Sequence, residues 1–201
     1  MLKDGEMEFT ATQWNNIWEE QTKSVHYDPD ERSMKVIRGY ISKYMRCSAK
    51  MFLEAGCGSA RSSLDAFLHH KGLSVTCLDI TPNALSLAKK LFRENNADGF
   101  FVCGDLRNMP FRDSVFDFVF SDGAIEHFKE TSFSIDEMRR LLKDGGRAFV
   151  TVPRISLPML TWGQFEGNIP NIPVVRSLFT FAHKRLFCSR FMKNGCELSF
   201  T

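Results

Sequence analysis

The stretch from Met51 to Arg61, Met-Phe-Leu-Glu-Ala-Gly-Cys-Gly-Ser-Ala-Arg, constrains the fold more than any other part of the chain. It begins as a short apolar run and ends in a turn of small residues that opens onto a helical pattern. Gly56 and Gly58 lack a Cβ, so they tolerate positive φ and allow a close approach to the backbone. A strand that turns into a helix N-terminus beside such glycines suits a polar or anionic group. The stretch therefore predicts a strand–turn–helix unit with a nucleotide-type cofactor site.

Five apolar runs along the chain are typical of strands, and helical patterns lie among them. The second run, Ser74–Asp79, is continuous rather than alternating, as expected for a strand that is buried on both faces. Strands that alternate with helices form a parallel sheet with right-handed crossovers. The sequence therefore predicts an α/β fold with a doubly wound, mostly parallel sheet. Its strands are expected at about 50–55, 74–79, 99–104, 115–120 and 147–152.

The first expected helix, at about 10–23, starts with Thr10-x-x-Gln13, which has the spacing of a capping box. Trp14, Ile17 and Trp18 follow at helical spacing. These aromatic residues favour a short helix that packs on the domain, or a flap that covers the cofactor and substrate.

Two other helices carry start signals of their own. Asp28 followed by Pro29 favours a helix with Asp28 as its cap. Ser134 and Glu137 have capping-box spacing for the helix before the fifth strand. Apolar residues at helical spacing after Asp28 predict that its helix covers one face of the sheet.

Carboxylates follow the first four strands, at Glu54, Asp79, Asp105 and Asp122. Because the carboxyl ends of parallel strands meet at one edge of a sheet, we expect these acids along a single rim. Each acid alone is also typical of a turn or a helix start. Four neighbouring carboxylates would repel one another unless a ligand with hydrogen-bond donors or positive charge lay between them. The pattern as a whole therefore favours a ligand site.

The dinucleotide motif G-x-G-x-x-G is incomplete here, because Arg61 occupies its third small position. With Glu54 in front, the turn reads Glu-x-Gly-x-Gly and resembles motif I of the class I (Rossmann-like) S-adenosylmethionine-dependent methyltransferases of the small-molecule type. Three later segments resemble that family in the same order, and the matches span about residues 50–153. They are Gly-Asp at 104–105, Phe-Asp-x-Val-x-Ser-Asp-Gly-x-x-Glu-His-Phe at 116–128 and Lys-Asp-Gly-Gly-Arg at 143–147.

This resemblance implies that S-adenosylmethionine is the cofactor, with S-adenosylhomocysteine as the product, and that an O, N or C atom is methylated. Asp79 is expected to accept from the ribose hydroxyls and Asp105 from the adenine amine, with Leu106 behind the ring. His127 is the candidate general base for an acceptor that must lose a proton, and local packing at a helix start is the alternative. No metal is expected. The expected cofactor-binding residues are Glu54, Gly56, Cys57, Gly58, Asp79, Ile80, Asp105, Leu106, Ser121 and Asp122.

Composition narrows the choice of partners. The 201 residues carry a net charge of +2, with 43% apolar and 25% charged residues, which indicates neither nucleic acid nor a membrane as partner. The six cysteines are scattered, and the N-terminus does not resemble a signal peptide. We therefore expect reduced thiols and a cytoplasmic location. The resemblance implies a small-molecule or lipid-like methyl acceptor.

Three regions are expected. Residues 1–48 form N-terminal helices that include the flap, residues 49–153 form the cofactor-binding core, and residues 154–201 form a substrate cap and the start of a truncated C-terminal region. Family members usually add a hairpin of strands six and seven after the fifth strand. Because the C-terminal region is expected to be truncated, we expect this sheet to lack that hairpin. Its exposed fifth strand would then favour a homodimer. The basic, Phe-rich stretch at about 174–193 leaves a membrane-surface helix as an alternative to the cap.

Two other functions stay open. A non-catalytic module that binds S-adenosylmethionine, or a subunit of a methyltransferase complex, fits a truncated end. An NAD-dependent oxidoreductase would bind a pyrophosphate, which Glu54 would repel and for which Arg61 leaves little room.

Overall fold

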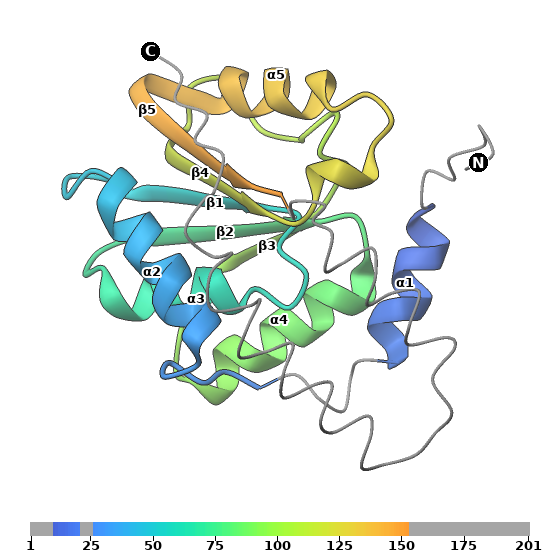
Figure 1. The fold of residues 1–201 in the computed structure, drawn as a ribbon, viewed down its shortest axis with the longest axis horizontal. Coiled ribbons are helices and arrows are strands. Elements are labelled where there is room, and N and C mark those ends of the chain that lie inside the picture. The colour runs from blue at the N-terminus through green and yellow to red at the C-terminus, as the bar shows by residue number, and fades with distance from the viewer. Residues whose placement is uncertain (1–9, 21–25, 153–201) are drawn as a thin grey trace, which may run out of the picture. The chain divides into compact units, whose positions relative to one another are not determined.

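The computed structural model describes residues 10–20 and 26–152. Five strands form one parallel sheet, which confirms the predicted α/β fold (Figure 1). The strands are β1 (Met51–Ala55), β2 (Ser74–Asp79), β3 (Phe100–Cys103), β4 (Phe116–Asp122) and β5 (Leu142–Thr151). Their order is β3-β2-β1-β4-β5. The predictions about strands six and seven, the cap and the truncation concern residues 153–201, which lie outside the described residues.

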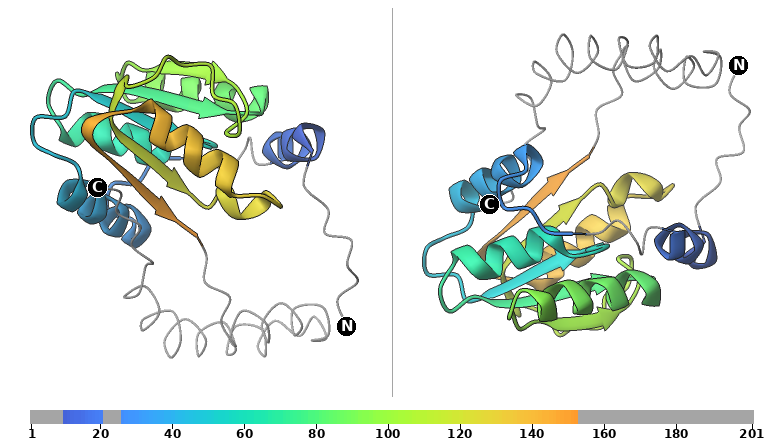
Figure 2. Two further views of the ribbon diagram at one scale, coloured as in Figure 1. Left: turned by 90° about the horizontal axis from the view of Figure 1, so that it is seen from above. Right: turned by 90° about the horizontal axis from the view of Figure 1, so that it is seen from below.

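Helices cover both faces of the sheet (Figure 2). They are α1 (Ala11–Glu20), α2 (Arg32–Tyr44), α3 (Arg61–His69), α4 (Pro82–Glu94), the single 3-10 turn η2 (Ile125–His127) and α5 (Ser132–Leu141). The apolar sides of α2, α3 and α4 pack on one face, where stacked phenylalanines from β1 and β4 form the floor. The apolar side of α5 packs on the other face. None of the described helices is long and apolar enough to cross a membrane.

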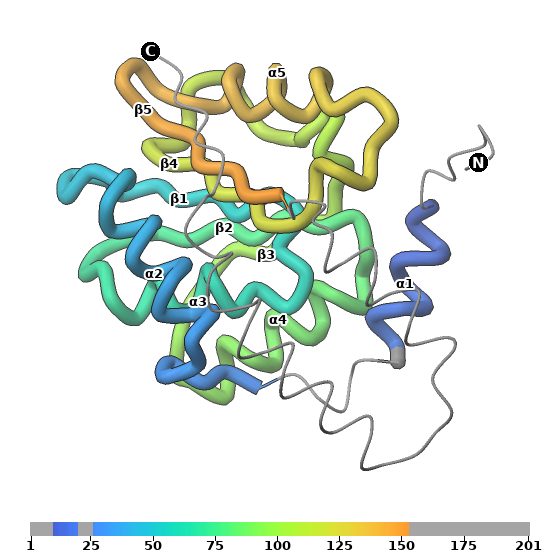
Figure 3. The backbone as a smooth tube through the Cα atoms, viewed as in Figure 1, coloured from blue at the N-terminus to red at the C-terminus, as the bar shows by residue number. Residues whose placement is uncertain are grey.

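β1 occupies the centre of the sheet. Glu54 lies in register with Cys77 of β2 and with Phe120 of β4, so the three strands end at the same edge. The chain reverses its direction of winding between β1 and β4, and this arrangement opens a crevice beyond the strand ends. The loops after β1, β2 and β4 meet there (Figure 3).

Of the three helix starts predicted above, the structure confirms the one at Thr10 and differs at Asp28 and Ser134. In α1 the predicted capping box is present, with 2.8 Å from Thr10 N to Gln13 Oε1 and 3.3 Å from Gln13 N to Thr10 Oγ1. α2 begins only at Arg32, because Asp28 accepts from the N–H of Asp30 and closes a turn instead. α5 begins at Ser132, before the predicted cap. Ser134, the predicted cap, is therefore buried inside the helix.

Candidate active site

A pocket of about 320 Å³ lies at the carboxyl edge of the sheet. Its walls come from the loops after β1, β2, β3 and β4, from helices α1 and α2 and from the first turn of α3. It brings together all but two of the predicted cofactor-binding residues, and His127 as well. The lining residues are Trp14, Trp18, Ser33, Met34, Ile37, Glu54, Gly56, Cys57, Gly58, Ser59, Arg61, Ser62, Asp79, Ile80, Leu106, Asp122, Gly123, Ala124, His127 and Phe128.

The turn after β1 needs its glycines. Gly56 and Gly58 have φ of +77° and +52°. A Cβ on Gly56 would lie 2.5 Å from the Cβ of Ala124, and one on Gly58 would lie 2.5 Å from the ring of Trp18. A third left-handed residue follows, because Ala60 has φ 58° directly before α3. Arg61, which occupies the third small position of the dinucleotide motif, is the first residue of α3.

Glu54 is buried beneath this turn, with 4% of its surface exposed. Its carboxyl accepts from the backbone N–H of Ser63, at 2.9 Å, and from the Ser63 hydroxyl, in the first turn of α3. Burial raises the pKa of Glu54 to about 8; the nearby charges of Asp122 and Asp79 also raise it, and the bonds from Ser63 lower it. The buried carboxyl therefore favours any positive charge that is placed beside it.

Asp79, at the end of β2, ties two loops together. One carboxylate oxygen accepts from the N–H of Gly58 at 2.8 Å. The other accepts from the N–H and the hydroxyl of Thr81, at 2.9 and 2.7 Å. The glycine turn and the start of α4 are thus fixed by the same side chain, which also lines the pocket.

Asp105 and Ser121 are the two predicted residues that do not line the pocket. Both oxygens of Asp105 bind Arg107, with 2.7 Å between Asp105 Oδ2 and the guanidinium, and Arg107 holds the pKa of that carboxyl low. Ser121 is buried and donates to the carbonyl of Ala55 at 2.8 Å. Leu106, next to Asp105, does reach the pocket. The role of Asp105 in adenine binding therefore stays a prediction, and in this structure Ser121 holds β4 to β1.

His127 lies on the turn after β4 and has Trp14 and Glu126 as neighbours. Its ring meets the ring of Trp14 edge to face, with 4.7 Å between centroids. Its Nε2 lies 4.0 Å from Oε1 of Glu126, whose pKa is raised by burial. The imidazole therefore sits at the pocket between α1 and the β4 loop.

Helix α1 covers one side of the pocket with Trp14 and Trp18. Asn15, between them in the sequence, accepts from the N–H of Asn83 and also accepts, through its carbonyl, from the Asn83 amide, both at 3.2 Å. These bonds attach α1 to the start of α4.

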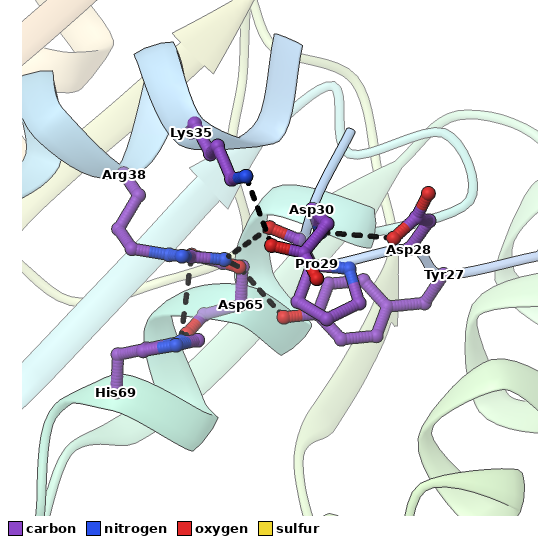
Figure 4. Close-up of polar contacts among 8 residues, drawn as sticks. All are labelled: Tyr27, Asp28, Pro29, Asp30, Lys35, Arg38, Asp65 and His69. Carbon is purple, nitrogen blue, oxygen red and sulfur yellow. Dashed lines mark hydrogen bonds and ion pairs between the residues drawn. The ribbon is translucent and has the colours of Figure 1, made fainter. Parts of the chain in front are cut away.

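Helix α2 is attached to α3 through the buried carboxylate of Asp65 (Figure 4). Arg38 donates to Asp65 through Nε at 2.9 Å and through its terminal nitrogen, which also donates to the carbonyl of Pro29 at 3.0 Å. Tyr27 donates to the same carboxylate at 2.6 Å, and burial with this bond raises the pKa of Tyr27. The network fixes the start of α2, whose next turns carry lining residues.

Several lining residues were not among the expected cofactor-binding or catalytic residues. Trp14 and Trp18 belong to the helix for which a flap over the cofactor was one of two predictions, and Arg61 directly follows the glycine turn. Ser33, Met34 and Ile37 face the pocket only because of how α2 packs, so no local pattern marks them.

Comparisons with known proteins agree with this geometry. Residues 53–150 match the family model described as a methyltransferase domain. The chain is 31% identical over 124 residues to the malonyl-[acyl-carrier protein] O-methyltransferase of Pectobacterium atrosepticum, which covers 60% of this chain and 47% of the relative. It is 29% identical over 119 residues to the demethylmenaquinone methyltransferase of Chlorobaculum tepidum, with coverage of 57% and 48%. The chain thus spans about half the length of these relatives.

A solved structure from Methanococcus maripaludis aligns over 91% of this chain and 88% of its own, with a TM-score of 0.60 and 20% identity. At that identity the likeness shows the fold alone. The strand order, the glycine turn and the family match together show that this chain contains a class I methyltransferase domain, which includes residues 53–150.

Proposed function

We propose that the chain binds S-adenosylmethionine in the pocket at the carboxyl edge and transfers its methyl group to a small-molecule or lipid-like acceptor, at an O, N or C atom. The observation that carries this proposal is the pocket itself, in which a glycine turn lies beside the carboxyl groups of Glu54, Asp79 and Asp122. The names of the relatives support methyl transfer as the reaction.

The residues present fit this cofactor. The pocket volume of about 320 Å³ is at the small end of the range for ligand sites. The glycines let Ala124 and Trp18, which line the pocket, pack directly against the turn, because a Cβ at Gly56 or Gly58 would lie 2.5 Å from them. Three carboxyl groups favour a ligand that carries an ammonium and a sulfonium. Glu54 and Asp79 would hold its charged and ribose parts, and Ile80 and Leu106 its ring.

When bound, S-adenosylmethionine supplies a methyl group that its positive sulfur has already activated. The protein has to align the acceptor with that group and exclude water. Trp14, Trp18 and Phe128 provide the apolar surface that excludes water. His127 is placed to take a proton from an acceptor that must lose one, and its contact with Trp14 fixes the ring.

The class of acceptor is inferred from the side of the pocket that α1, α2 and the loop after β4 line. Met34, Ile37 and the aromatic residues give this side an apolar lining, with His127 as its polar group. The two relatives are named for an acyl group on a carrier protein and for a quinone. An acceptor with an apolar body and one ionisable group near His127 fits both names. A cytoplasmic location and a homodimer also stay predictions from the sequence.

The test is methyl transfer from labelled S-adenosylmethionine to a panel of acyl-carrier acids, quinones and phenols. Labelled product and S-adenosylhomocysteine in equal amounts would support the proposal. Cofactor binding without turnover on any acceptor would favour the non-catalytic module, and no binding would exclude both.

A further inference from the structure

The pocket lining is unbalanced in charge. Glu54, Asp79 and Asp122 are acidic, and among the lining residues of the described chain Arg61 is the one Lys or Arg. S-adenosylmethionine carries two positive groups and one negative group, the carboxylate of its methionyl part. The acids suit the positive groups but repel the carboxylate. A cationic side chain at the pocket would offset this repulsion and bind that carboxylate.

Arg61 is placed to be this partner. It is the first residue of α3, and it follows the glycine turn directly. The first turn of a helix carries partial positive charge, which acts in the same direction as the guanidinium. Arg is also the side chain whose planar fork matches a carboxylate, with two parallel hydrogen bonds.

In the structure, Arg61 binds a protein carboxylate. Its terminal nitrogen lies 2.9 Å from Oε2 of Glu31, and the two side chains are 38% and 39% exposed. An ion pair with this much exposure is weak, because solvent screens it. Arg61 can therefore exchange Glu31 for another carboxylate at little cost.

Glu31 keeps other partners after such an exchange. Its second oxygen accepts from the Ser33 hydroxyl at 2.5 Å, and its N–H donates to the carbonyl of Asp28 at 3.2 Å. The same segment is also held at Pro29, two residues before Glu31, because Arg38 donates to the carbonyl of Pro29 (Figure 4). The start of α2 therefore stays in place when Arg61 leaves it.

We propose that Arg61 binds the methionyl carboxylate of the cofactor, and that Glu31 holds the guanidinium at the pocket until the cofactor arrives. This inference rests on the proposed function. It makes Arg61 the residue that distinguishes an amino-acid-bearing adenosyl ligand from one without a carboxylate.

The test is calorimetry with two ligands that differ only in that group, S-adenosylhomocysteine and decarboxylated S-adenosylhomocysteine. The Arg61→Gln variant should lose about ten- to a hundredfold in affinity for the first ligand, the range for a hydrogen bond to a charged group. Its affinity for the second should stay within about threefold, since no carboxylate is present. Arg61→Lys should recover part of the loss, because the charge remains while the fork is lost.

Glu31→Gln is the matched control, because it breaks the same ion pair and leaves Arg61 in place. It should leave the affinity for S-adenosylhomocysteine unchanged or raise it. If Arg61→Gln weakens both ligands equally, or if Glu31→Gln weakens binding as much as Arg61→Gln does, the pair is structural and the inference fails. If the parent chain binds neither ligand, the proposed function itself fails. Thermal unfolding of each variant shows whether the fold is kept.

Discussion

The two walls of the pocket are built differently. The strand-edge wall, residues 54–63 and 79–81, holds its two carboxyl groups in buried positions, with Glu54 bonded to Ser63 and Asp79 bonded to Gly58 and Thr81. The helical wall is formed by the pocket residues of α1 and α2, and its own contacts are weaker or lie away from the pocket. Helix α1 is attached by two 3.2 Å bonds between Asn15 and Asn83. The start of α2 meets the exposed pair Arg61–Glu31, and the body of α2 is attached through Arg38 to the buried Asp65.

This difference suggests a division of labour. The strand-edge wall is pre-organised, so changes there should damage folding and cofactor binding together. The helical wall should tolerate change with less effect on folding, and it therefore suits recognition of the acceptor.

The largest effect is expected where the two walls meet, at His127. His127→Ala should lower turnover by about a hundredfold or more, the usual contribution of a general base, while the affinity for S-adenosylhomocysteine changes little. Single-turnover rates and calorimetry measure the two quantities separately. Equal losses in both would contradict a base role and favour local packing.

The next largest effect tests the strand-edge wall through its backbone. Gly58→Ala puts a Cβ 2.5 Å from Trp18 at a φ of +52°, so it should destabilise the fold by roughly 2–4 kcal/mol and impair cofactor binding. Gly39→Ala is the control, because Gly39 lies in α2 with nothing within 4 Å of an added Cβ. It should stabilise the protein by about 0.5–1 kcal/mol. Urea unfolding measures the free energy of unfolding of both variants. Equal changes in the two variants would refute the close packing of Trp18 on the turn.

Asp79→Ala should weaken cofactor binding by roughly 1–3 kcal/mol, because it leaves buried N–H groups without partners and removes the expected ribose contact. Calorimetry with S-adenosylhomocysteine measures the loss. Asp98→Ala is the control, because Asp98 is an exposed acid between α4 and β3, and it should leave the affinity for S-adenosylhomocysteine unchanged. Unchanged affinity in Asp79→Ala would exclude the ribose role.

A smaller effect concerns pH. Burial raises the pKa of Glu54 to about 8 from an ordinary value of 4.5, so between these values the folded chain binds a proton that the unfolded chain has lost. The contribution of Glu54 to the free energy of unfolding is therefore greatest below about pH 4.5, and it falls as the pH rises towards 8. Glu54→Gln should remove this dependence in urea unfolding at several pH values.

The same carboxyl should release its proton when a cation binds beside it. Cofactor affinity should then rise between about pH 6 and about pH 8, by at most tenfold per pH unit. Calorimetry in two buffers of different ionisation enthalpy counts the released protons. Glu54→Gln is the control for titration of the cofactor's own amine, and the same proton release in variant and parent would rule out Glu54 as the source.

Sequence patterns predicted the strand-edge wall well, because its features are local. A strand buried on both faces is continuously apolar, so β2 was expected at 74–79 and lies there. Parallel topology then places Glu54 and Asp79 at one edge without further information.

The helical wall depends on tertiary contacts that no local pattern encodes. Asp28 bonds to Asp30 rather than capping α2, and Arg38, which binds the distant Asp65, also binds the carbonyl of Pro29 in the same segment. The contact of Trp18 with Gly58 joins residues far apart in the sequence. Asp105 was correctly expected after β3, but its turn toward Arg107 was not predicted.

The central claim is that an acid-lined pocket beside a glycine turn binds a cationic adenosyl ligand. Calorimetric titration of the chain with S-adenosylmethionine, followed by competition with S-adenosylhomocysteine and with NADH, tests it most directly. We expect saturable binding at a single site, displacement by S-adenosylhomocysteine and no displacement by NADH. Absence of binding, or displacement by NADH as effective as that by S-adenosylhomocysteine, would contradict the account.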